Sequence, residues 1–165
     1  GRSFVKKTRG GKVLKVVREH YTRDDLSCGS ALAEPQFRGT DAAQWKLGRE
    51  LSEGAHYLVV DTNVALHQLS LLENSAVQDI ILCSTVLQEV RKNNSAAYER
   101  LRALTTAPGR RVFVFSNEHH TKTYIGTGKP GESQNDRNDR AIRRVAQFYK
   151  VCLHCYFCNL KGRSF

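Results

Sequence analysis

The sequence has no methionine at any of its 165 positions, only one tryptophan and only three prolines. Because even the first residue is not methionine, we expect the chain to be a fragment of a longer protein or a processed form. No apolar run approaches the roughly eighteen residues of a membrane-spanning helix, and no signal peptide is recognisable. We therefore expect an intracellular domain with no membrane partner, in which the five cysteines stay reduced or bind metal.

Acidic residues are also scarce, since 26 Lys and Arg face 16 Asp and Glu and give a formal charge of +10. Such an excess makes a polyanion, most often nucleic acid, the expected partner, and the alternative is a solvated face that only aids solubility. Residues 1–23 carry eight of the basic side chains and a single acid, Glu19. Two β-prone runs there flank Arg9-Gly10-Gly11, a pattern that predicts a hairpin. We expect a phosphate-contacting or protein-docking arm, or alternatively a solvated edge strand protected by its lysines.

After residue 55, three short apolar runs at 58–60, 79–83 and 112–115 alternate with helical patterns. This alternation predicts an α/β, three-layer fold with a central parallel sheet flanked by helices. The last helix should present Ile142, Val145, Ala146 and Tyr149 to the sheet. Residues 22–54 show no regular spacing of apolar residues, so we interpret them as a connecting segment with a helical turn near 42–51. Trp45 is expected to anchor this segment to the domain.

Acidic residues follow each apolar run. Asp61 comes directly after 58–60, which we interpret as a strand buried on both sides, Glu89 lies one turn inside the next helix, and Asp136 and Asp139 open the last one. These positions meet at the carboxyl edge of a parallel sheet. Crowded carboxylates repel unless a cation compensates, and their oxygens suit Mg²⁺ or Mn²⁺. The alternatives are that Asp136 and Asp139 cap their helix and that Glu89 is a solvated residue.

The chain resembles a known family at these residues. Three stretches are similar to the acidic motifs of PIN-domain ribonucleases, namely Val60–Asn63, Leu87–Val90 and Asn138–Ile142. The resemblance is closer to one branch, the PIN domain at the N-terminus of the eukaryotic exosome's catalytic RNase II-type ribonuclease. It rests there on Phe4–Arg9, Val16–Tyr21, Arg23–Asp25, Asn117–His120 and Asn135–Ile142.

This resemblance implies a PIN-like fold with an N-terminal β-hairpin extension and a metal-dependent endoribonuclease that uses one or two Mn²⁺ or Mg²⁺ ions. The substrate would be single-stranded RNA in RNA processing and decay. The N-terminal segment would dock on exosome core subunits. The protein would be located in the nucleus and nucleolus, and also in the cytoplasm. By position, Asp61, Glu89 and Asp139 would be catalytic metal ligands with Asp136 as a neighbouring ligand. The RNA-binding residues would be Lys6, Lys7, Arg9, Arg137 and Arg140, and Asn63 and Asn117 would line the site.

The chain divides into a docking part (1–54), a PIN nuclease domain (55–150) and an atypical Cys-rich tail (151–165). Two features depart from the family. No acid follows Asp139 where the family has a fourth, and only Cys28 remains of an N-terminal three-cysteine motif. Zinc binding by Cys152, Cys155 and Cys158 with His154 is an alternative for the tail, although a β-prone run would point them to alternate faces.

Two other functions are compatible with the sequence. In the first, the domain is a docking module that tethers a separate exonuclease and has weak or no catalysis of its own. In the second, it is a phosphatase-like enzyme with Asp61 as nucleophile. That chemistry usually needs a second aspartate two residues later, and position 63 is Asn.

Overall fold

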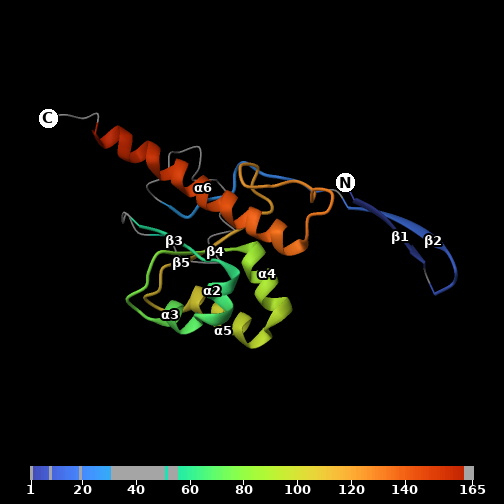
Figure 1. Cartoon of the computed structure of the whole chain (residues 1–165), viewed down its shortest axis with the longest axis horizontal. Coiled ribbons are helices and arrows are strands. Elements are labelled where there is room, and N and C mark those ends of the chain that lie inside the picture. Colours follow the sequence, from blue (N-terminus) through green and yellow to red (C-terminus); the bar gives the residue numbers. More distant parts are fainter. Residues whose placement is uncertain (1, 8, 19, 31–50, 52–55, 162–165) are drawn as a thin grey trace.

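The computed structural model of the chain describes residues 2–7, 9–18, 20–30, 51 and 56–161, with only the backbone at 2–7, 14–18 and 152–161. The predicted hairpin is present. Strand β1 (Arg2–Lys7) pairs antiparallel with β2 (Val13–Arg18), and Figure 1 shows the pair extending away from the other elements. The predicted helical turn at 42–51 and its anchor Trp45 lie outside the described residues, apart from Leu51.

The predicted parallel sheet is also confirmed. Strands β3 (Leu58–Val59), β4 (Ile80–Cys83) and β5 (Val112–Phe115) lie in the order β3-β4-β5, all parallel. Helix α6 (Gln134–Lys161) covers one side of the sheet (Figure 1). The opposite side carries the other helices of the described residues, which are α2 (Thr62–His67), α3 (Leu69–Glu73), α4 (Ser84–Asn93) and α5 (Ser95–Thr106). The fold is therefore a three-layer α/β PIN-like fold.

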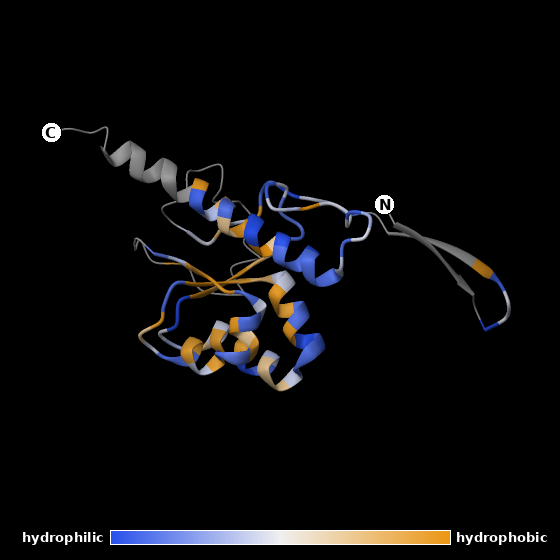
Figure 2. Cartoon of the chain, viewed as in Figure 1, coloured by the Kyte–Doolittle hydropathy of each residue, from blue (hydrophilic) through white to orange (hydrophobic). Residues whose placement is uncertain are grey.

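The core lies on both faces of β4, whose four side chains are all buried because neighbours cover the strand from each side. Figure 2 shows the apolar residues on the strands and on the inner faces of the helices. On the α6 side, Phe148 and Tyr149 pack on Phe115 with ring centroids 5.5 and 5.4 Å away. Phe148 is buried and Ala146 is exposed, so the predicted apolar stripe of α6 was wrong at one position.

The prediction that residues 58–60 form a strand buried on both sides was wrong. Leu58 is 40% exposed, Val59 is half-buried and only Val60 is buried. The reason is the strand order, since β3 lies at one edge of the described sheet and β4 takes the central place. A continuous apolar run does not reveal which strand will be central.

Part of the segment that we interpreted as a connection belongs to the core. Residues Leu26–Ser30 are all buried, and the backbone N–H of Leu51 donates to the Gly29 carbonyl at 2.9 Å. The Tyr149 hydroxyl donates to the carbonyl of Cys28 at 2.6 Å. Gly29 has φ +75°, and a Cβ there would lie 2.5 Å from the Phe113 ring. Only glycine fits this conformation and this close approach.

The segment just after the hairpin is fixed to the loop that follows β5. The Arg23 backbone N–H donates to the His119 carbonyl at 2.7 Å, and its carbonyl accepts from the Thr121 N–H at 3.0 Å. The His20 ring stacks with two others, with centroids 4.4 Å from Tyr124 and 5.2 Å from His119. These contacts connect the base of the hairpin to the domain.

Helix α6 is longer than predicted, because it continues to Lys161 through a stretch that we interpreted as β-prone. The β propensity of Val, Cys, Tyr and Phe is a weak preference, and a helix already fixed by packing extends at little cost. The cysteine side chains of the zinc alternative (Cys152, Cys155 and Cys158) lie outside those that the structure describes. No helix in the described part of the chain has the length and hydropathy needed to span a bilayer.

Candidate active site

Asp61 stands where β3 turns into α2. Its backbone is extended, with φ −85° and ψ 157°, and its carbonyl accepts the Ala65 N–H at 3.0 Å, which starts the helix. The Asp61 side chain is half-buried and forms no capping hydrogen bond. The carboxylate is therefore not used to cap α2 and remains available at the carboxyl edge of the sheet.

Glu89 on α4 is connected to this point by one hydrogen bond. The hydroxyl of Thr62, buried next to Asp61, donates to Glu89 Oε2 at 2.8 Å. Glu89 itself is half-buried. This contact supports the predicted meeting of the first two acids and argues against the alternative of a freely solvated glutamate.

The two acids of α6 differ in their surroundings. Ser133 caps the helix, its hydroxyl donating to Asp136 Oδ2 at 2.7 Å, and the Asp136 N–H donates back to the Ser133 hydroxyl oxygen at 3.1 Å. This is a capping box with aspartate at the third helical position. Asp136 is exposed and occupied by the cap, whereas Asp139 is half-buried and takes no part in it. Asp139 is therefore the acid of α6 better placed for a role in the site.

The helices that carry the acids touch one another, since α4 packs against both α2 and α6. Within the described residues, however, no three His, Cys, Asp or Glu side chains form a metal-binding group. The structure thus brings the predicted acids to neighbouring elements without gathering three of them around one point. The donors fit Mg²⁺ or Mn²⁺ in kind, because all are carboxylate oxygens.

Asn117, predicted to line the site, has a structural contact. It is buried after β5, and its Oδ1 accepts from the Ser84 hydroxyl at 2.9 Å and from the Thr85 N–H at 3.2 Å. Its amide group donates to the Thr85 hydroxyl at 2.8 Å. Cys83 occupies the N-cap position of α4 and makes no side-chain cap bond, so Asn117 supplies the missing acceptor from the turn after β5. Asn63, the other predicted lining residue, is exposed on α2.

Of the predicted RNA-binding residues, Arg137 and Arg140 hold the loop before α6. Arg137 donates to the Gly126 carbonyl at 2.7 Å. Arg140 makes two bonds of 2.8 Å to the Glu132 carboxylate and one of 3.2 Å to the Ile125 carbonyl. The bidentate hydrogen bond from Arg140 lowers the pKa of Glu132 to about 2.

The other predicted RNA-binding residues lie on the N-terminal hairpin. Arg9 is exposed in the turn, and the side chains of Lys6 and Lys7 lie outside those described.

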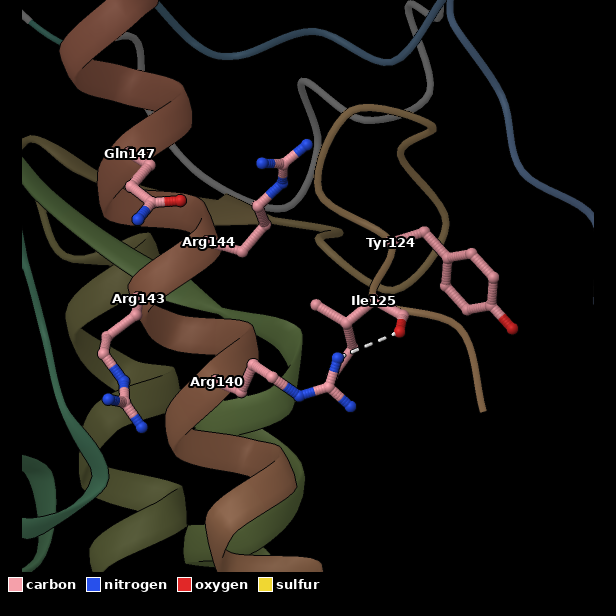
Figure 3. A pocket seen from close by; sticks show the side chains of 6 residues that line it. All are labelled: Tyr124, Ile125, Arg140, Arg143, Arg144 and Gln147. Atoms are coloured by element: carbon pink, nitrogen blue, oxygen red, sulfur yellow. Dashed lines mark hydrogen bonds between the residues drawn. The ribbon is translucent and has the colours of Figure 1, made fainter. Parts of the chain in front are cut away.

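The sequence analysis did not identify three residues near the candidate site. One is Thr62, although a threonine directly after the first acid was visible in the sequence. The other two are Arg143 and Arg144 on α6. Those two line an open hollow of about 500 Å³ with Arg140, Tyr124, Ile125 and Gln147 (Figure 3).

Comparison with known proteins agrees with this geometry. A family model described as "PIN domain" matches residues 58–157. Two proteins named "Exosome complex exonuclease RRP44" are similar to the chain, one from Mus musculus at 40% identity and one from Homo sapiens at 41%. Each match covers 90% of this chain and 16% of the relative, so the chain spans about one sixth of the length of these relatives.

One solved structure, titled "Structure of T. brucei RRP44 PIN domain", superposes with a TM-score of 0.70 at 29% sequence identity. The match covers 82% of this chain and 71% of that one. Both the fold and the arrangement of its elements are therefore shared with a solved PIN domain.

Proposed function

The chain belongs to the PIN domain family, and on that basis we propose that it is the endoribonuclease domain of an exosome ribonuclease that cleaves single-stranded RNA with a divalent metal. The names of its relatives support a nuclease domain and an exosome setting. The observation in the molecule that carries the proposal is the hydrogen bond from Thr62 to Glu89, 2.8 Å long. It ties Glu89 of α4 to the residue that directly follows Asp61, at the edge where parallel sheets bind ligands.

In this proposal Asp61, Glu89 and Asp139 would hold Mn²⁺ or Mg²⁺, with Asp136 as a neighbour. A bound ion of this kind lowers the pKa of water and offsets the charge of a phosphodiester. Thr62 fixes Glu89 Oε2, which leaves Oε1 to orient the attacking water or accept its proton. Asp61 follows β3 and Asp139 lies on α6, so the substrate phosphate would bind between these elements.

The test is cleavage of a circular single-stranded RNA, which has no ends for an exonuclease, in the presence of Mn²⁺. We expect the wild-type chain to linearise the circle and Asp61→Asn to lose most of this activity. Glu99→Gln is the matched control, because it also removes one acid but from the exposed face of α5. Equal rates for wild type and Asp61→Asn would overturn the assignment.

A docking role is the second candidate, favoured by the hairpin that projects from the domain (Figure 1). Here residues 1–18 would bind exosome core subunits, and the complex would reside in the nucleus and nucleolus, with the cytoplasm as a further place. Deleting residues 1–18 from the full-length protein should abolish assembly, while neutralising Asp61, Glu89 and Asp139 should leave it intact. Loss of assembly in the acid variant alone would contradict this division.

A further inference from the structure

The hollow beside α6 carries two arginine charges that no carboxylate of the described residues pairs with. Of the three arginines that line it, Arg140 is neutralised by Glu132. Arg143 and Arg144 are both exposed, and neither has an ion pair with a carboxylate among the described residues. A local charge of about +2 in an open hollow attracts phosphate groups.

Both guanidinium groups are oriented by neutral partners. Arg143 Nε donates to the Asp139 carbonyl at 3.3 Å, and Arg144 Nε donates to the Lys122 carbonyl at 3.0 Å. A bond through Nε fixes the direction of the side chain. The two Nη groups can then donate together to the oxygens of one phosphate. The Arg140–Glu132 ion pair and the Arg140 bond to Ile125 hold the opposite wall, the loop visible in Figure 3.

The hollow also adjoins the proposed active site. Asp139, Arg143 and Gln147 are spaced four residues apart on α6, so they form one row along the helix. The other wall carries Tyr124, whose ring continues the stack with His20. Aromatic rings next to phosphate-binding arginines are typical of surfaces that bind single strands, whose bases are free to stack.

We propose that this arginine groove, made by Arg143, Arg144 and Tyr124, binds the phosphodiester backbone of single-stranded RNA and leads the strand to Asp139. The nature of the ligand rests on the proposed function, but the site is separate from the metal-binding acids. It also differs from the predicted RNA-binding pair Arg137 and Arg140, which the structure uses to hold the loop.

The test measures binding of a labelled unstructured oligouridylate in EDTA at several salt concentrations, so that no cleavage is needed. Each phosphate contact on a single strand contributes about 0.7 to the slope of log affinity against log salt. For Arg143→Gln/Arg144→Gln we expect the slope to fall by about 1.4, an affinity loss that grows roughly 25-fold for each tenfold dilution of salt.

The matched control is Lys92→Gln/Arg102→Gln, which removes two exposed charges from α4 and α5 instead. A slope change as large in the control, or an unchanged slope in the groove variant, would overturn the inference. An unchanged slope in the groove variant is also the result expected if the groove binds a protein instead of RNA. Thermal melting of each variant checks folding, which substitution of exposed side chains should preserve.

Tyr124 provides an independent measurement. Tyr124→Leu should weaken binding at least about fivefold without changing the salt slope, because it removes a stacking ring and no charge. Tyr124→Phe, which keeps the ring, should bind like the wild type. Equal affinity for Tyr124→Leu and the wild type would remove the base-stacking part of the inference.

Cleavage of circular RNA then separates the two proposals. If Arg143→Gln/Arg144→Gln loses binding and raises KM more than it lowers kcat, both proposals are supported. If the groove variants lose binding while the wild-type chain never cleaves, the groove stands and the nuclease assignment fails. If the groove variant cleaves RNA at the normal rate with an unchanged KM, the groove inference is overturned and the nuclease assignment stands.

Discussion

Gly29 gives the sharpest test of how the N-terminal part of the chain joins the domain. Its φ is +75°, and a Cβ atom added there would lie 2.5 Å from the ring of Phe113. Phe113 is fully buried in β5, so its ring has no free space to enter. Gly109 has nearly the same φ, +73°, but a Cβ atom added at Gly109 would have no neighbour within 4 Å. The two glycines therefore separate backbone strain from steric overlap.

Alanine in the left-handed region costs about 1–2 kcal/mol, part of which is offset by the reduced entropy of the unfolded chain. Gly109→Ala should therefore lower the free energy of unfolding by about 1 kcal/mol. Gly29→Ala adds the cost of overpacking a filled core, typically 1–3 kcal/mol, for a total of about 3 kcal/mol. In a domain of this size this corresponds to a fall in Tm of roughly 6–12 °C for Gly29→Ala and roughly 2–4 °C for Gly109→Ala.

Urea denaturation followed by far-UV circular dichroism measures both variants against the wild type. The expected result is a difference of about 2 kcal/mol between the two substitutions. Equal destabilisation would refute the reasoning, because it would mean that residues 26–30 do not press on Phe113 in solution.

Three further substitutions test single contacts. Asn117→Ala removes the acceptor that caps α4 and leaves buried polar groups unpaired, so it should cost about 3 kcal/mol in chemical denaturation; a loss below about 1 kcal/mol would contradict the cap. Because the pKa of Glu132 is lowered to about 2 by Arg140, the ion pair stabilises the fold above the ordinary pKa of 4.5 and is lost as the pH falls towards 2. The Tm difference between wild type and Glu132→Gln should therefore shrink between pH 4.5 and pH 2, and a constant difference would argue against the ion pair. Thr62→Val should reduce Mn²⁺-supported cleavage several-fold by releasing Glu89 while the fold persists, and unchanged cleavage would remove the hydrogen bond from the mechanism.

The elements of the fold were predictable because their signals are local. The apolar runs at 80–83 and 112–115 are bounded by turn and capping residues, and strands alternating with helices leave one common topology. The prediction that each acid lies near the carboxyl edge of the sheet rests on the same rule. What the pattern could not show was strand order, which depends on contacts far apart in the chain, so the exposure of Leu58 was missed.

The contribution of residues 26–30 was hidden for a related reason. Ser27-Cys28-Gly29-Ser30 has the composition of a loop, and it is buried because Phe113 and Tyr149 cover it. Similarly, no sequence signal assigns Asn117 to the start of a helix that begins 33 residues earlier. Such partners are set by the packing of the whole domain and not by neighbours in sequence.

The basic composition shows the same limit in the candidate RNA surface. Arg110 donates to the carbonyl of Asn74 at 2.6 Å, Arg111 is paired with Asp79 at 2.9 Å, and Arg140 is paired with Glu132. These arginines count toward the formal charge of +10 but hold chain segments in place. An arginine already engaged with a carboxylate adds little to the attraction of a phosphate, because its charge is balanced at close range. A long-range attraction to RNA would therefore come from charges without a carboxylate partner, and on α6 these include the exposed Arg143 and Arg144, which motif reasoning passed over.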